Sequence, residues 1–574
     1  MPRKPMLAVL GAMLVLLTFC SGGNGSSDDA DADAEEAMDL STEEAVEDVG
    51  EEEPEEDVED DAADMVEEEV SSALALALGE VEEIDTIEEG VFDVEIAAPE
   101  GGEQYALILF ATDWVRGATY DFTSSLSGTG GGGRGSADRP ESLPNVEHPL
   151  MPHGRAPVDW AAVYHWLGSN PIPKWDELPD DPLPEVDEVR EFSITDGSDH
   201  VQTIDAQCQF VDEEIAIWFD ITSEPETVVE ELDEIGSLFA GMVMPRERVF
   251  FGDESDYNGD GVLHVLFSPF VAESATAYFY PCDLFENPGE VAGCRYGNRA
   301  EMLYVSPPNL LDEHMRSAMA IVETMAHETA HMIYFHRKFL LNDQPMAMEN
   351  IYLNEGLAAL AQDLTGMAAG NFFVMQAGLA QIETFRAIDI LYNMGGYIPD
   401  RDGGLRGQAY LFLRYLYDQA GGEEVQSDGS FIDSGGIAWL NAYVDDAERG
   451  QELIEAMMGD RAIEETVFDF YTALVLSNRG PDGAPISDNP AYNYLPTRVD
   501  PLTERTRGAD MFENFRGMFQ LEGPANGFID FNDGTIYSTG VQYLFFDAGE
   551  PGTLQVHVEI DAAAAARMRV ARVK

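Results

Sequence analysis

Two histidines four residues apart in an apolar segment constrain this chain more than any other feature. His327 and His331 flank Glu328 within the largely apolar run Ile321–Phe335. On an α-helix, residues four apart share one face, so both imidazoles can reach one metal ion. Glu328 can face the open coordination position and take a proton from water there. The H-E-x-x-H spacing therefore predicts a helix that binds zinc.

A third ligand is expected on a later helix. Glu355 lies 24 residues after His331, in the sequence Asn-Glu-Gly-Leu-Ala, and is predicted to open a helix that ends near Asp363. A carboxylate there would complete a His2Glu site and would suit a helix N-terminus. His336 is expected to turn away from the metal because it follows His331 by five residues. The alternative for His327 and His331 is an ordinary amphipathic helix without a metal ion, but two buried histidines and a buried glutamate need a compensating partner.

These two motifs together resemble the gluzincins, the zinc peptidases that include thermolysin, and most closely the hyicolysin type. The resemblance covers about residues 190–480 and implies an α+β, zincin-like catalytic domain with a mixed sheet and a helical lower subdomain. It implies an endopeptidase that cleaves peptide or protein substrates, with Glu328 as general base. It also implies a donor to the substrate carbonyl, for which Tyr410 and Tyr415 are candidates unless both only pack in the core.

The resemblance leaves one position open. Thermolysin has an aspartate four residues after its glutamate ligand, where this chain has Ala359. Asp363 or Glu323 is therefore predicted to orient a ligand histidine instead.

The acidic segment that leads into the predicted strand 262–268 has the pattern of a cation-binding loop. Asp256, Asn258 and Asp260 place oxygen ligands at every second position, as in the first half of an EF-hand. The twelfth position is Phe267 rather than glutamate, so calcium would need further ligands. The other interpretation is a plain acidic turn before a strand.

The N-terminus has the features of an export signal. Arg3 and Lys4 precede the apolar run 7–19, which ends at Cys20. The sequence Leu-Thr-Phe-Cys resembles a bacterial lipobox, although Phe19 departs from the small residue usual there. We expect either a lipoprotein anchored at Cys20 in the outer membrane or on the cell surface, or a secreted protein.

The remaining cysteines fit an exported protein. Cys282 and Cys294 close a short loop and are predicted to form a disulfide, which leaves Cys208 in a strand-like stretch. The chain has 110 acidic and 30 basic residues, a net charge of −80. Such a charge repels nucleic acid and anionic lipid, so we expect no nucleic-acid partner and membrane contact only through the lipid anchor.

Changes in composition divide the chain into five predicted regions. They are a signal peptide (1–20), a disordered acidic tether (21–70), a β-rich region with an irregular linker (71–187), the zinc peptidase domain (188–500) and a C-terminal β-domain (501–574). Predicted strands are 105–112, 204–211, 214–219, 262–268, 275–280, 302–305, 527–531, 542–546 and 553–560, and predicted helices include 227–240 and 312–339. One competing functional hypothesis is a surface binding or adhesion protein on a peptidase-like fold, with the small β-domains as the binding part. Another is a metal-dependent hydrolase that acts on lipid or sugar, since the motif alone does not define the substrate.

Overall fold

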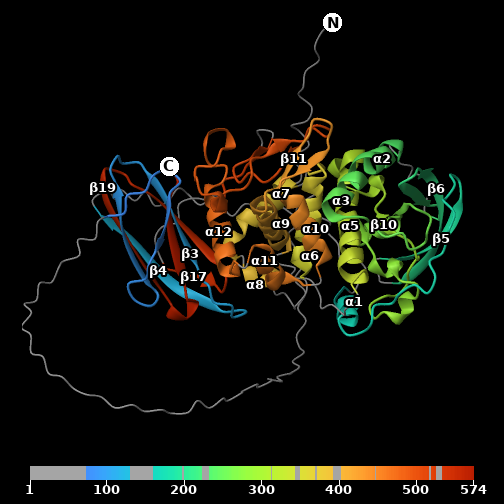
Figure 1. Cartoon of the computed structure of the whole chain (residues 1–574), viewed down its shortest axis with the longest axis horizontal. Helices are drawn as coiled ribbons and strands as arrows, with labels where there is room; N and C mark the ends of the chain where they lie inside the picture. Colours follow the sequence, from blue (N-terminus) through green and yellow to red (C-terminus); the bar gives the residue numbers. More distant parts are fainter. Residues whose placement is uncertain are drawn as a thin grey trace, which may run out of the picture. The chain divides into compact units, whose positions relative to one another are not determined.

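A six-stranded mixed sheet supports the predicted metal helix (Figure 1). Its spatial order is β5 (Val189–Thr195), β6 (Val201–Val211), β7 (Ile215–Asp220), β8 (Leu263–Phe267), β10 (Met302–Val305) and β9 (Ala277–Phe279). The three strands β7, β8 and β10 are parallel, whereas β9 runs antiparallel at one edge. Every residue of β7, β8 and β10 is buried, which agrees with their continuous apolar sequences.

The structure is a computed structural model, and it describes part of the chain. The described residues are 73–128, 160–196, 200–222, 232–311, 313–342, 350–368, 371–384, 386–391, 402–446, 448–459, 461–515, 519–524 and 533–574. The predicted signal peptide, Cys20 and the acidic tether lie outside these ranges, as does the predicted strand 527–531. Among the described residues, no helix combines the length and hydropathy needed to span a lipid bilayer.

Helix α5 (Ala318–Phe335) carries both histidines of the motif and packs against strands β9 and β10. Ser317 caps its start by accepting a hydrogen bond from the backbone N–H of Ala320. Two shorter helices, α2 (Leu232–Leu238) and α3 (Met244–Phe251), also pack on α5. The metal helix is therefore covered by other elements along most of its length, and almost all its side chains are buried.

A helical region follows α5 in the chain. It contains α6 (Ile351–Leu364), α7 (Asn371–Ala380), α8 (Ala387–Leu391), α9 (Asp402–Gln419), α10 (Gly436–Asp445), α11 (Gly450–Met457) and α12 (Ile463–Leu476). The long helix α9 lies against both α6 and α7. Glycines allow this close approach, because a Cβ atom on Gly356 would lie 2.8 Å from the backbone of Ala409.

Short elements complete this part of the chain. They are α1 (Trp160–Leu167), α4 (Pro269–Ala272) and the two-stranded pairs β11 (Glu423–Val425) with β12 (Phe431–Asp433), β13 (Arg498–Val499) with β14 (Thr506–Arg507), and β15 (Asn514–Phe515) with β16 (Phe519–Gln520).

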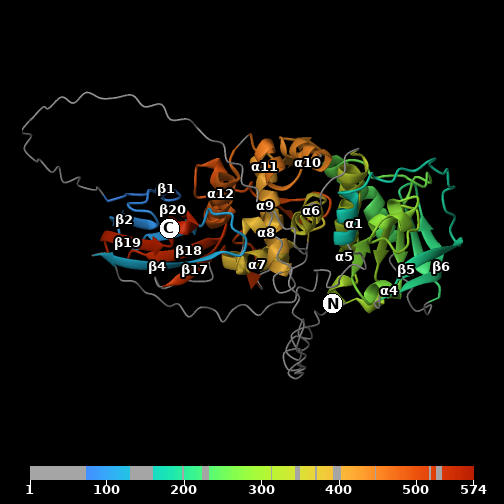
Figure 2. The same cartoon turned by 90° about the horizontal axis from the view of Figure 1, so that it is seen from below.

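Strands from both ends of the described chain form two four-stranded sheets (Figure 2). One sheet has the order β1 (Val81–Ile84), β20 (Arg567–Arg572), β3 (Gln104–Phe110), β18 (Val541–Asp547), and the other has the order β17 (Gly534–Tyr537), β4 (Thr119–Gly128), β19 (Gly552–Ile560), β2 (Val91–Ala98). Their facing side chains share one hydrophobic core. The prediction of separate β regions at 71–187 and 501–574 is therefore wrong: their strands pair with each other in both sheets.

Strand β3 connects this β unit to the helical region. Its alternate residues Tyr105, Leu107 and Leu109 belong to the core between the two sheets. Phe110 points the other way and packs its ring against Phe468 and Tyr471 of α12, with centroids 5.3 and 5.4 Å apart. Both faces of β3 are therefore buried.

The cysteines follow the sequence prediction. Cys282 and Cys294 form a disulfide, with Cα atoms 5.5 Å apart, in the loop that follows β9. Cys208 is free and buried within β6. The predicted α+β class is also confirmed, since the described residues form both helices and sheets.

Candidate metal centre

His327 and His331 lie on one face of α5, one turn apart. Their ring centroids are 4.8 Å apart and each residue is 8% exposed. The residues around them, including Met325, Ala330 and Met332, are buried. The apolar segment thus becomes a buried helix that presents two imidazoles side by side, as the spacing predicted.

Glu355 of α6 reaches the same place. Its Oε2 atom lies 3.3 Å from Nε2 of His327 and 3.9 Å from Nε2 of His331. One ligand atom from each of the three residues lies within 4.8 Å of the others, so the group can hold a metal ion. The helix begins at Ile351, however, and not at Glu355 as predicted. Glu355 therefore sits in the second turn, and the cap belongs to Asn350.

Two neutral amides on α6 orient the histidines. Nδ1 of His327 lies 3.2 Å from Oε1 of Gln362, and Nδ1 of His331 lies 3.1 Å from Oδ1 of Asn354. A carbonyl oxygen only accepts, so each Nδ1 carries a proton, and each Nε2 is left on the side of Glu355 as the atom that can bind a metal ion. The prediction that Asp363 or Glu323 has this role is wrong.

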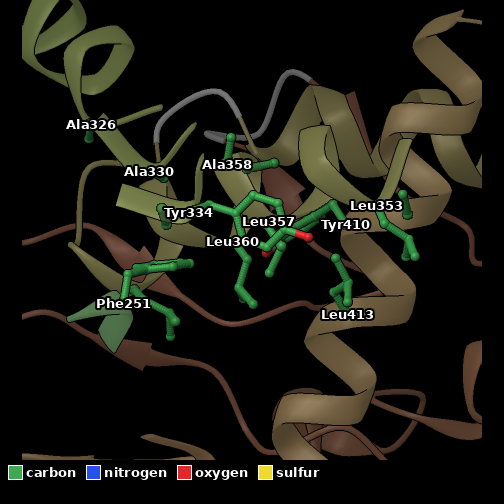
Figure 3. Close-up of a cluster of buried hydrophobic side chains, with 14 of the residues drawn as sticks. Phe251, Ala326, Ala330, Tyr334, Leu353, Leu357, Ala358, Leu360, Tyr410 and Leu413 are labelled. Carbon is green, nitrogen blue, oxygen red and sulfur yellow. The ribbon is translucent and has the colours of Figure 1, made fainter. Parts of the chain in front are cut away.

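Asp363 instead anchors a buried ionic network behind α6. Its carboxylate accepts hydrogen bonds from Arg414 at 2.8 Å, from the backbone of Gly508 at 2.8 Å and from the Tyr410 hydroxyl at 3.2 Å. Figure 3 shows Tyr410 among the buried aliphatic side chains of α6 and α9. The hydroxyl of Tyr415 donates to the backbone of Ala491. These hydrogen bonds direct the hydroxyl groups of the two predicted donors, Tyr410 and Tyr415, toward Asp363 and Ala491 rather than toward the histidines.

Glu328 lies beside the ligand group on α5 and is 5% exposed. Its Oε2 atom accepts a hydrogen bond of 3.0 Å from the backbone N–H of Phe279, in the edge strand β9. Burial raises the pKa of Glu328 to about 7, although the neighbouring His327 opposes this shift. Glu328 is therefore fixed at one oxygen, and its pKa is close to neutral pH.

The pKa values of His331 and Glu355 are shifted far from their usual values. Burial lowers the pKa of His331 to about 4, so this imidazole is neutral at pH 7. Burial also opposes ionisation of Glu355, but Arg406 and the two histidines hold the pKa of that carboxyl well below its usual value. A neutral imidazole and an ionised carboxylate are the forms that bind metal.

Arg406 is a site residue that the sequence analysis missed. It lies on α9, and Nη1 of its guanidinium contacts Oε2 of Glu355, the same oxygen that faces the histidines. Both side chains are 15% exposed. No motif marks Arg406, since its position depends on the close packing of α9 on α6 at Gly356.

The predicted calcium loop is closed by its own hydrogen bonds. Oδ1 of Asp256 accepts from the backbone of Gly261 at 3.2 Å, and Oδ1 of Asn258 accepts from the backbone of Asp260 at 3.3 Å. Oδ2 of Asp260 lies 2.8 Å from Nε2 of the buried His264. Within the described ranges, no group of three or more His, Cys, Asp or Glu side chains placed to share an ion includes Asp256 or Asp260. Calcium at this loop stays a prediction.

No model of a known protein family matches this chain, and no curated protein matches its sequence.

Proposed function

We propose that this protein is a metallopeptidase whose zinc ion is bound by His327, His331 and Glu355. The observation that carries the proposal is the convergence of these three ligand atoms within 4.8 Å, with Glu328 beside them. The donor set suits zinc, because two imidazole nitrogens and one carboxylate oxygen leave one coordination position open. The hydrogen bonds at both Nδ1 atoms support the fit, because they leave both Nε2 atoms as ligands.

The residues around this group have the chemistry that peptide hydrolysis requires. When bound, a zinc ion supplies Lewis-acid activation of the substrate carbonyl and of water. Glu328 takes a proton from the attacking water and then delivers it to the nitrogen of the leaving amine. A carboxyl with a pKa of about 7 suits both transfers near neutral pH. The Phe279 N–H holds one oxygen of Glu328, which limits the rotation of the carboxylate during these steps.

The disulfide supports export of the chain. Such bonds persist in oxidising compartments and are rare in the cytosol. The Cys282–Cys294 bond therefore agrees with the proposed export, while lipidation of Cys20 is a separate proposal that rests on the lipobox-like sequence. Mass spectrometry of the N-terminal peptide tests it directly.

The decisive experiment compares metal content and hydrolysis in the purified protein. We expect one zinc ion per chain, cleavage of a mixed peptide library, and loss of cleavage with a chelator that is reversed by added zinc. Glu328→Gln is expected to keep its zinc and to lose activity by roughly 10²- to 10⁴-fold, since it removes only the proton acceptor.

A matched control uses the same helix. Glu323 is also buried on α5, but its carboxylate pairs with Arg505 rather than with the ligand group. Glu323→Gln should keep measurable activity. Full activity in Glu328→Gln, or a zinc-loaded wild-type protein that cleaves no peptide, would contradict the proposed function.

A further inference from the structure

Arg406 is the cationic side chain in contact with the carboxylate of the ligand group. We propose that its guanidinium donates a hydrogen bond to the carbonyl oxygen of the scissile peptide as negative charge develops there. This is the role that the resemblance suggested for Tyr410 or Tyr415, and the inference rests on the proposed peptidase function.

Arg406 lies next to the ligand group and is partly exposed to solvent. Its Nη1 atom contacts Oε2 of Glu355, which in turn lies 3.3 Å from Nε2 of His327. The side chains of Arg406 and Glu355 are each 15% exposed, somewhat more than the 10% of His327 and the 9% of His331. A substrate that reaches the ligand group from solvent therefore meets the guanidinium at the same place.

The packing of α9 on α6 fixes this position. Gly356 directly follows Glu355, and Ala409 lies less than one turn after Arg406. Because a Cβ atom at Gly356 would lie 2.9 Å from the Cβ of Ala409, the two helices are in direct contact here. Arg406 is thus held beside Glu355 by the helix packing as well as by its own charge.

The two tyrosines are less suited to this role. Both are fully buried, and their hydroxyl groups bind Asp363 and the backbone of Ala491. Using either one would require breaking a buried hydrogen bond. Arg406 has a larger capacity for this role, since a guanidinium carries five N–H donors and stays protonated throughout the reaction.

The chemical step balances without any further reactant. The water oxygen forms a bond to the carbonyl carbon, the π electron pair moves to the carbonyl oxygen, and Glu328 takes the proton. When the carbonyl re-forms, the C–N bond breaks and Glu328 returns the proton to the amine nitrogen. Arg406 stabilises the charged oxygen between these events and is itself unchanged.

Because Arg406 is positively charged, its removal is expected to act differently on metal affinity and on kcat. A guanidinium beside the ligand group repels a metal cation, so Arg406→Met should leave metal affinity unchanged or increase it. The same change removes an oxyanion donor, so kcat should fall by roughly 10²- to 10³-fold. Binding of a phosphinic peptide, whose charged tetrahedral group imitates the oxyanion, should weaken in parallel. Arg406→Lys keeps the charge and should retain intermediate activity.

Each measurement uses the full chain. Zinc affinity is obtained by competition with a chelating dye, kcat and KM with a peptide found in the library, and the inhibition constant with the phosphinic peptide. Arg337→Met is the matched control, because the Arg337 side chain is similarly exposed, at 19%, but pairs with Asp445, outside the ligand group. It should change neither kcat nor inhibitor binding.

The outcomes separate the two proposals. An active wild type with normal kcat in Arg406→Met overturns the inference alone. A parallel loss of zinc affinity and kcat also overturns it, since Arg406 would then only position Glu355. If Arg406→Met does not fold, Arg406→Lys still decides the matter, because unchanged inhibitor binding and kcat in a variant without the planar fork would argue against the role. A zinc-loaded but inactive wild type overturns the proposed function and this inference together.

Discussion

His336 follows the metal helix directly but takes no part in the ligand group. Its Nδ1 atom lies 3.2 Å from the hydroxyl of Tyr257, whose ring stacks on Trp175 at a centroid distance of 5.8 Å. Burial lowers the pKa of His336 to about 4, and the adjacent Arg337 acts in the same direction. A neutral ring can accept a hydrogen bond from the Tyr257 hydroxyl at Nδ1, whereas a protonated ring cannot.

This arrangement predicts a loss of stability in mild acid. An unfolded histidine has a pKa of about 6.5, so between pH 6.5 and pH 4 the unfolded chain binds more protons at His336 than the folded chain. The contribution is complete above pH 6.5 and is lost as the pH falls to 4. It amounts to roughly 3 kcal/mol of unfolding free energy.

His336→Asn isolates this contribution, because the amide oxygen can replace Nδ1 as acceptor but does not titrate. Urea denaturation from pH 7 to pH 4 should show a smaller loss of stability in the variant than in the wild type. The same change at the exposed His165 is the control. Identical pH dependence of the wild type and His336→Asn would contradict the prediction.

At the residue scale, the sequence was informative where chemistry imposes a spacing. The four-residue interval of His327 and His331 predicted their shared helix face, and Glu355 was found because it lies in a second motif. Gln362 and Asn354 were missed because an amide that orients a histidine needs no fixed spacing, only a helix placed at the right distance. The site was thus predictable in its ligands but not in the groups that orient them.

At the scale of the elements, local patterns predicted which segments are regular but only approximately where they end. Strand β10 has the predicted bounds, and α5 occupies the centre of the longer predicted helix 312–339. Helix α6 begins four residues before the predicted start at Glu355, because the side chain of Asn350 caps the helix by accepting a hydrogen bond from the backbone N–H of Tyr352. Helix ends depend on single capping bonds, whereas periodicity depends on many residues.

The contact between α6 and α9 gives a prediction at this scale. A Cβ atom at Gly356 would lie within 3.0 Å of backbone atoms of Ala409, which a small side-chain movement cannot relieve. Gly356→Ala should therefore lower the free energy of unfolding by roughly 1–2 kcal/mol, despite the better helix propensity of alanine. Zinc affinity should fall as well, since Glu355 precedes this position directly.

Gly241 offers the control, because a Cβ atom there would meet nothing within 4 Å. Gly241→Ala should be neutral or slightly stabilising. Urea denaturation and zinc titration of both variants provide the comparison. Equal stability of Gly356→Ala and the wild type would show that α6 and α9 can separate without cost.

At the scale of the described chain, pairing between distant strands was beyond sequence reasoning. Phe110 is opposite Val541 on one side and Arg567 on the other, so its partners lie more than 400 residues away. Strands β3, β18 and β19 correspond to the predicted strands 105–112, 542–546 and 553–560, but the sequence of a strand does not identify its partner. The two ends therefore read as separate domains, although their strands form the same sheets.

Buried contacts of α12 with β20 and β3 join the β unit to the helical region. Arg569 of β20 is 2% exposed and bonds to Asp469 of α12 at 2.7 Å. Phe468 and Tyr471 of the same helix pack on Phe110 of β3. Removing the β unit would expose both rings, at roughly 2–3 kcal/mol each, and would take the buried Arg569 away from Asp469, which would keep its ion pair with the more exposed Arg461.

These losses are large against a typical domain stability of about 5–15 kcal/mol, so the helical region should not fold well alone. We expect a fragment of residues 160–515 to bind a hydrophobic dye and to unfold without a cooperative transition, whereas residues 73–574 should unfold cooperatively. Calorimetry and dye fluorescence of both fragments test this. A monomeric 160–515 fragment that unfolds at the temperature of the longer one would show that the β unit is dispensable. The helical region depends on the β unit because one face of β3 belongs to the core between the two four-stranded sheets and the other face to the core shared with the helical region.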